Sequence, residues 1–317
     1  MRGDPRLAKL LKTKLRIPVM AGPMFIASTP ALAIAQCRSG IIGSMPALNA
    51  RTTALLDEQI ASIEIGLGDC DVPFAINLVA HKSNKRLEAD LEIVVARKIP
   101  IVVLALATSP TIVQAIHDYG GLVFNDVASN RHARKCGDLG VDGVIAVSAG
   151  AGGHTGSVSP FALVAEIREW WEGPLMLAGS IATGRAILGA EALGADLAYI
   201  GSPFLACVEA NTPFGFKQMV VDSASRDIVV TNGFTGANAS FLLPSLLASG
   251  LDPATLAKPK GSGVDVTGGG HPKAWRDIWS AGQGIGAVKA SLPAADYIAN
   301  LATDYQRARE AMGMGRE

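Results

Sequence analysis

The segment with the clearest potential for chemistry is a glycine-rich loop that carries a single histidine. It runs Ser148-Ala149-Gly150-Ala151-Gly152-Gly153-His154-Thr155-Gly156. A backbone without bulky side chains can lie flat along a ring, while the imidazole faces the reacting atom. Imidazole titrates near neutral pH and serves as a general base or acid. We predict that His154 is catalytic; the alternative is a hydrogen-bonded histidine with only a structural role.

Small and polar residues also stand where the short apolar runs of the chain end. Any one of them is explained by a tight turn, but the whole set indicates a flat, polar ligand that the backbone approaches closely. The set consists of Ala21, Gly22, Pro23, Met24, Ser44, Asn77, Thr108, Asn125, Asp126, Ser148, Gly179, Ser180, Gly201 and Ser202.

Two pairs of neighbouring residues in this set predict a phosphate site. Gly179-Ser180 precedes a helix that is expected to begin near Thr183-Gly184, and Gly201-Ser202 follows the last apolar run. The ends of the seventh and eighth strands of an α/β barrel commonly hold phosphate through backbone N–H groups and a helix N-terminus. Neither loop contains Lys or Arg, so N–H donors and the helix dipole would do the binding.

The elements that must position these residues are eight short apolar runs. Each is too short for a buried helix and lacks polar alternation, which is typical of a strand buried on both faces. Stretches with helical periodicity separate them, and several of these stretches end in glycine. Eight strands favour a closed (β/α)8 TIM barrel over an open, doubly wound sheet. The runs are 17–21, 41–44, 74–78, 101–105, 122–126, 143–147, 175–179 and 197–201.

The alternation stops near residue 210. We expect the barrel to comprise 1–209 and 273–317, with 210–272 forming a small helical insertion, or lid, over the barrel mouth after the eighth strand. The expected helical pieces are 220–230 and 240–250, followed by a Gly/Lys/Pro-rich loop.

Composition excludes several classes of function. Lys+Arg and Asp+Glu both total 28, and no basic stripe indicates a nucleic-acid partner. The N-terminal segment lacks the pattern of a signal peptide, and no apolar run reaches membrane-spanning length. The four cysteines have no spacing that predicts a disulfide framework or a metal site. The expected location is the cytoplasm, and the sequence leaves open whether the chain is a monomer or a homodimer.

Taken together, these motifs resemble those of the nitronate monooxygenase family, formerly called 2-nitropropane dioxygenases. The resemblance rests on Gly-Pro-Met after the first strand, FAINL, AGAGGHTG, AGS, GSPF and the WSAGQG near the C-terminus. The superfamily includes FMN-dependent NAD(P)H:quinone reductases and a flavin-dependent enoyl-acyl-carrier-protein reductase. The resemblance implies an FMN-bearing barrel.

The resemblance also implies roles for individual residues. Gly22, Pro23 and Met24 would contact the flavin ring through backbone, Asn77 would lie near its pyrimidine side, and His154 would face its N5 atom. The full set of expected cofactor contacts is Ala21, Gly22, Pro23, Met24, Asn77, Asn125, Ser148, Gly152, Gly153, Gly179, Ser180, Gly201, Ser202, Ser280, Gly282 and Gln283.

Three departures from the family pattern bear on substrate choice. This chain has Ala21 where many members have Gln, Gly150 where many have Glu, and Pro203 where Arg is usual. The first functional hypothesis is oxidation of alkyl nitronates with O₂. The second is an NAD(P)H:quinone reductase, in which Lys258 and Lys260 could contact the NADH or NADPH donor. An enoyl-acyl-carrier-protein reductase and a non-catalytic phosphate-binding barrel are weaker alternatives.

Overall fold

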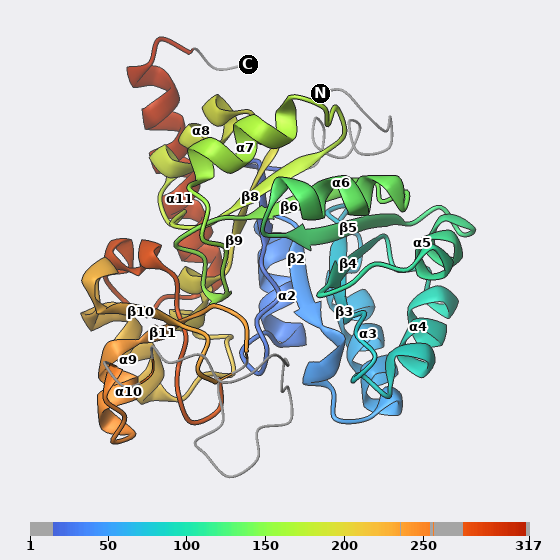
Figure 1. Cartoon of the computed structure of the whole chain (residues 1–317), viewed down its shortest axis with the longest axis horizontal. Coiled ribbons are helices and arrows are strands. Elements are labelled where there is room, and N and C mark those ends of the chain that lie inside the picture. The colour runs from blue at the N-terminus through green and yellow to red at the C-terminus, as the bar shows by residue number, and fades with distance from the viewer. Residues whose placement is uncertain (1–14, 235, 254–255, 257–274, 315–317) are drawn as a thin grey trace.

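The computed structural model describes residues 15–234, 236–253, 256 and 275–314, and its centre is a parallel β-barrel (Figure 1). Neighbouring strands follow the order β1-β9-β8-β6-β5-β4-β3-β2, all parallel. The Ala21 N–H donates to the Ile42 carbonyl at 2.8 Å, which joins the first strand to the second and closes the ring. The strands are β1 (Val19–Ala21), β2 (Gly43–Pro46), β3 (Phe74–Val79), β4 (Ile101–Ala105), β5 (Leu122–Val127), β6 (Gly143–Val147), β8 (Leu175–Ala178) and β9 (Leu197–Ile200). The predicted TIM barrel is confirmed.

Helices connect successive strands and cover the outside of the barrel. Proline at a first helical position and Ser or Thr caps mark several starts, and glycines with positive φ follow several ends, including Gly40 at +91° and Gly120 at +87°. Such glycines tolerate the left-handed backbone that ends a helix. The helices are α2 (Pro30–Arg38), α3 (Thr53–Leu67), α4 (Leu87–Ala96), α5 (Pro110–His117), α6 (Asn130–Asp138), α7 (Pro160–Arg168) and α8 (Gly184–Leu193).

Strand side chains divide into two packed layers because successive residues of a strand point to opposite faces. On β5, Phe124 packs inside the barrel, whereas Val123 and Val127 pack outward against the helices. Both faces are apolar, as the unbroken apolar runs in the sequence predict. This alternation decides which polar residues near the strand ends face the barrel mouth.

The segment after β9 differs from the helical insertion that we expected. It contains α9 (Phe214–Asp222), a hairpin of β10 (Ile228–Thr231) and β11 (Ala239–Leu242), and α10 (Leu243–Ala248). The β-branched run Ile228-Val229-Val230-Thr231 favours strand, and the Asn232-Gly233 pair that follows it is a common turn signal. The helix expected at 220–230 is therefore wrong over most of its length, and the helix expected at 240–250 is wrong at its start. The Gly/Lys/Pro-rich loop, with Lys258 and Lys260, lies outside the described residues.

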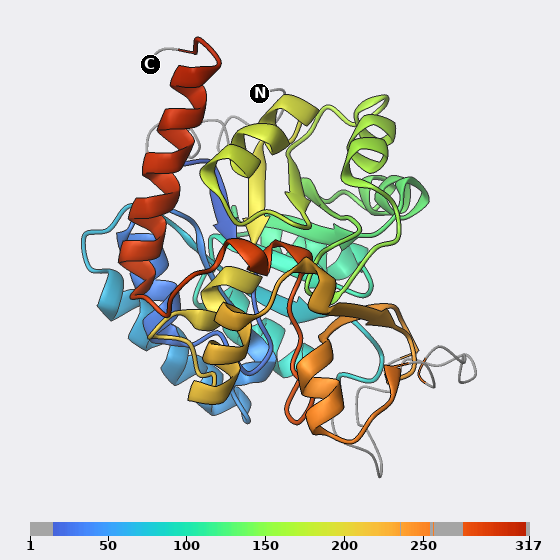
Figure 2. The ribbon, with the colours of Figure 1, turned by 90° about the vertical axis from the view of Figure 1, so that its left-hand side faces the viewer.

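The chain then returns to the barrel. A 3-10 helix (Gln283–Ala287) crosses the mouth, and α11 (Ala294–Ala311) packs on the outside against α8. Gly184 lies against the backbone of Leu301–Tyr305, so a larger residue there would push the two helices apart. Figure 2 shows α11 running along the barrel, apart from the hairpin and α10. Within the described part of the chain, no helix is both long and apolar enough to cross a membrane.

Candidate active site at the barrel mouth

The histidine of the glycine-rich loop belongs to a short strand, β7 (Gly153–His154), and not to a free loop. This strand pairs antiparallel with β11, with His154 opposite Ala239, and the Thr155 N–H donates to the Asn238 carbonyl at 2.9 Å. The insertion thus forms a three-stranded sheet with the loop that follows β6. Pairing fixes the backbone of His154 over the barrel mouth.

The His154 ring lines a large cavity at this mouth. Its ring centroid lies 5.1 Å from that of Trp275, in an edge-on arrangement. The Nε2 atom is buried and has no hydrogen-bond partner among the described residues. Burial lowers the pKa of His154 because the charged imidazolium is poorly solvated there. The side chain is therefore neutral at physiological pH and is suited to accept a proton or a hydrogen bond.

A segment near the C-terminus joins the loops around the cavity. Ser280 Oγ accepts from the Gly153 N–H at 2.9 Å and donates to the Ser240 carbonyl at 2.5 Å. Gly282 N–H donates to Ser202 Oγ at 2.7 Å, and Gln283 N–H donates to the Gly150 carbonyl at 2.9 Å. The loops after β6 and β9 and strand β11 are thus all hydrogen-bonded to residues 280–283, which we call the C-terminal strip.

The strip approaches the loops so closely that glycine is required. A Cβ on Gly282 would lie 2.6 Å from the Gly150 oxygen and 2.7 Å from the Gly152 nitrogen. A Cβ on Gly152 would lie 2.7 Å from Ser202 Oγ. The predicted phosphate loops, at Gly179-Ser180 and Gly201-Ser202, contact these closely packed glycines, Gly150, Gly152 and Gly282, which we call the glycine wall. Thr183 caps α8 beside them by accepting from the Ala186 N–H.

Two polar side chains lie at the floor of the cavity: Asp126 was expected among the strand-end residues but not among the cofactor contacts, and Tyr199 was not expected from sequence. Asp126 on β5 and Tyr199 on β9 line the cavity, and Asp126 Oδ1 and the Tyr199 hydroxyl are buried without a partner among the described residues. Burial raises the pKa of Asp126 to about 7. Burial, with a smaller contribution from the charge of Asp126, raises the pKa of Tyr199 well above its ordinary value. Below about pH 7, Asp126 therefore retains a proton that an ordinary carboxyl would lose.

Most predicted site residues come together at this cavity. Those that line it are Gly22, Pro23, Met24, Asn77, Gly152, Gly153, His154, Gly179, Ser180, Gly201, Ser202, Ser280 and Gly282. The predicted residues that do not line it are Ala21, Asn125, Ser148 and Gln283.

Strand alternation explains the clearest of these differences. Asn125 is buried on the outer face of β5, where its Oδ1 accepts from Thr108 Oγ1 at 2.5 Å. The next residue, Asp126, takes the inward position. Ser148 is likewise buried, and its Oγ donates to the Ala178 carbonyl at 2.7 Å. Asn125 and Ser148 therefore support the strand ends and do not face the cavity.

Comparisons with known proteins identify the family of the chain. The family model for nitronate monooxygenase matches residues 83–304. A nitronate monooxygenase of Paraburkholderia phytofirmans is 25% identical over 93% of this chain and 94% of its own length. A putative monooxygenase of Mycobacterium tuberculosis is 35% identical, but the match covers 51% of this chain and 44% of that protein. A Rhodococcus jostii dehydrogenase whose name specifies a carboxyl-CoA substrate is 26% identical over 68% of this chain and 58% of its own length.

Solved structures show the same architecture. A variant of FabK from Thermotoga maritima aligns with a TM-score of 0.77 at 25% identity, over 97% of this chain and 98% of that one. A nitroalkane oxidase from Streptomyces ansochromogenes has a TM-score of 0.79 at 23% identity, over 96% and 99% of the two chains. The second likeness shows the fold alone.

A TIM barrel whose mouth joins glycine-rich loops to a half-buried, neutral histidine defines a class of barrel enzyme that binds its ligand at the strand ends. Within that class, the chain belongs to the nitronate monooxygenase family and is a flavin-dependent oxidoreductase.

Proposed function

We propose that the chain binds FMN across the barrel mouth and oxidises alkyl nitronates with O₂. The observation that carries this proposal is the grouping, around one cavity, of three buried polar atoms that have no partner in the described part of the chain. They are His154 Nε2, Asp126 Oδ1 and the Tyr199 hydroxyl. Buried polar groups are nearly always hydrogen-bonded in native proteins, so these atoms are suited to a polar ligand.

The residues present fit a flavin nucleotide. Gly22, Gly152 and Gly282 keep the walls free of side chains, which suits a flat ring approached by backbone. Gly179-Ser180 and Gly201-Ser202 would hold the phosphate beside the N-terminus of α8. Bound there, FMN would supply a two-electron acceptor for the substrate and a route for those electrons to O₂.

The chain's own groups would bind and orient the substrate. Neutral His154 would accept a proton from a nitroalkane. Toward a nitronate anion, His154 would serve as a hydrogen-bonding partner through its ring N–H. Trp275, packed edge-on against His154, would exclude water from that side of the ring. We further propose that 210–272 acts as an insertion on the barrel formed by 1–209 and 273–317.

The second candidate is an NAD(P)H:quinone reductase, because Arg51, Lys85, Arg86 and Arg276 line the cavity whereas Asp126 is its sole acidic lining residue among those described. Anaerobic mixing separates the two candidates. Nitronate oxidation predicts that propionate-3-nitronate bleaches the bound flavin faster than NADH or NADPH does. Rapid bleaching by a nicotinamide together with no reaction with the nitronate would favour the reductase and refute the first candidate.

A further inference from the structure

The cavity carries an excess of positive charge that the whole chain does not. Lys+Arg and Asp+Glu are equal in the sequence, at 28 each. Among the described residues the cavity is lined by Arg51, Lys85, Arg86 and Arg276, against one carboxylate, Asp126, on the floor. The excess therefore belongs to the cavity rim.

Two of these four cations are already paired. Arg276 contacts Asp277 Oδ2 at 2.7 Å, and Arg86 contacts Asp90 Oδ1 at 2.8 Å. Within the described residues, neither Arg51 nor Lys85 makes an ion pair or a side-chain hydrogen bond. Their charges are available to a ligand.

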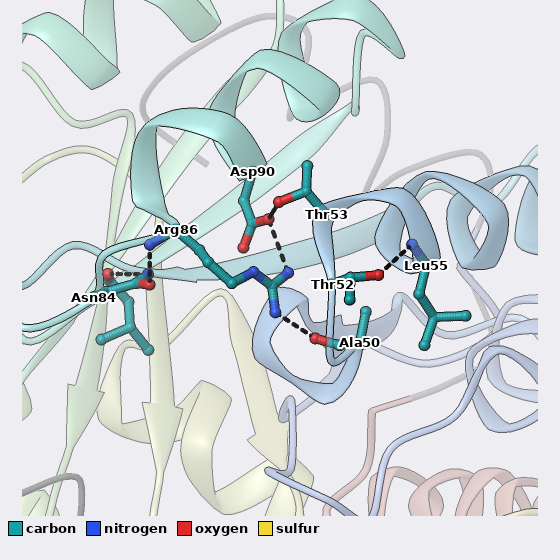
Figure 3. A network of polar contacts seen from close by, with 8 residues as sticks. Ala50, Thr52, Thr53, Leu55, Asn84, Arg86 and Asp90 are labelled. Atoms are coloured by element: carbon teal, nitrogen blue, oxygen red, sulfur yellow. Dashed lines mark hydrogen bonds and ion pairs between the residues drawn. The ribbon is translucent and has the colours of Figure 1, made fainter.

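A buried network fixes the backbone next to both free cations (Figure 3). Arg86 Nη1 donates to the Ala50 carbonyl at 2.5 Å, and its Nη2 donates to fully buried Asp90. Thr53 Oγ1 donates to the same Asp90 oxygen at 2.8 Å. Arg51 directly follows Ala50 and Lys85 directly precedes Arg86, so the network joins the two loops that carry the free cations.

These cations lie on loops of the barrel mouth other than the two that would hold the cofactor phosphate. Lys85 follows β3, and Gly179-Ser180 follows β8; in a closed ring of eight, β3 is four strands from β8 in either direction. Arg51 follows β2, which is three strands from β8 and two from β9, so the two cations and the phosphate loops occupy different parts of the rim. The cavity measures about 2040 Å³, above the roughly 300–1,000 Å³ of typical small-molecule pockets, and so has room for a second ligand.

We propose that Arg51 and Lys85 form a second anion subsite, which binds the phosphate-bearing tail of the substrate or of a hydride donor while the reactive end lies at His154. This inference rests on the proposed function, because it assumes that the chemistry occurs in this cavity. It extends that function from small nitronates to molecules that carry a nucleotide diphosphate. A nicotinamide dinucleotide and a coenzyme A thioester both have this chemistry.

The test uses ADP as the probe, because it carries the diphosphate that both sources share. Calorimetry measures ADP binding to the FMN-loaded protein, and to the FMN-free protein in parallel. We expect Arg51→Gln and Lys85→Gln to weaken binding about 3-fold each, and the double variant about 10-fold, in line with partly exposed charge pairs. The salt dependence of binding should also become shallower in the double variant.

The matched control is Lys82→Gln/Arg131→Gln, which removes the same net charge at residues that do not line the cavity. It should bind ADP like the wild type. Equal ADP affinity in the two double variants, or no ADP binding by the wild type at millimolar concentration, would overturn the proposal. Loss of FMN binding alone would instead refute the proposed function, since ADP binding is also measured without FMN.

A second pair of titrations separates the two sources of the tail. Weaker binding of NADPH or NADH by the Arg51/Lys85 double variant, with acetyl-CoA unaffected, would identify a hydride donor as the ligand. The reverse result would identify a thioester. If the variant binds all three as the wild type does, the subsite does not exist.

Discussion

The hydroxyl of Ser280 accepts a hydrogen bond from the Gly153 backbone at 2.9 Å, across 127 residues of sequence. It therefore fixes the residue immediately before His154. The same hydroxyl donates to the Ser240 carbonyl on β11, the strand that pairs with His154. The Ser280 side chain thus connects the segment near the C-terminus to β7, which carries His154, and to β11.

Removing this hydroxyl should loosen His154 without removing it. Ser280→Ala should destabilise the fold by about 1–3 kcal/mol, because buried polar groups lose their partner, and should lower kcat about tenfold. Thr29→Val is the control: Thr29 Oγ1 likewise accepts from one backbone N–H, that of Leu32, and donates to one carbonyl, that of Glu209, but outside the cavity. Urea unfolding and steady-state kinetics measure both effects. Equal loss of kcat in the two variants would show that Ser280 has no specific role.

His154 itself should control turnover and not cofactor binding. His154→Ala should lower kcat by about 10²–10⁴, the usual contribution of a general acid or base, while the flavin spectrum is retained. Because burial lowers the pKa of His154, it stays neutral to a lower pH than free imidazole. The loss of kcat/KM on acidification should therefore have its midpoint below about pH 6.5. The residual activity of the variant should not show this loss. A His154→Ala protein with wild-type kcat would exclude the catalytic role.

The buried carboxyl should make the stability of the FMN-free protein depend on pH. The pKa of Asp126 is about 7 in the folded state against about 3.9 unfolded, so the folded state holds the proton more tightly. The contribution of protonated Asp126 to the free energy of unfolding is fully present below about pH 4. It is lost as the pH rises towards 7, by at most about 4 kcal/mol. The Asp126→Asn variant has no ionisable group at this position, so its free energy of unfolding should fall less as the pH rises. Parallel pH profiles of unfolding free energy for the two proteins would refute the raised pKa.

The glycine wall provides a test of the cofactor cradle. Gly282→Ala would place a methyl group 2.6 Å from the Gly150 oxygen, so the strip and the loop must separate. FMN affinity should fall at least about tenfold, equivalent to about 1.4 kcal/mol. Gly286→Ala is the control in the same segment, since its nearest neighbour would lie at 3.7 Å. FMN titration monitored by flavin fluorescence compares them, and equal affinities would mean that the close approach at Gly282 is not needed for binding.

The sequence predicts the barrel well because its strands are buried on both faces and form unbroken apolar runs. It predicts less of the site, since periodicity within a run does not tell which face of a strand looks into the barrel. Asn125 and Asp126 are adjacent, and only the packing of Phe124 inside the barrel shows that Asp126 is the inward residue. The position of His154 in a strand depends on β11, a partner 85 residues later that no local pattern specifies. The turn signal at Asn232-Gly233 could have revealed the hairpin.

If this barrel mouth holds FMN beside His154, the purified protein should carry the cofactor. The visible spectrum, with mass spectrometry of the chromophore released on denaturation, should show FMN bound at one molecule per chain. A protein stripped of cofactor should regain the spectrum when FMN is added. A colourless protein that takes up no FMN would show that the barrel mouth is not a flavin site.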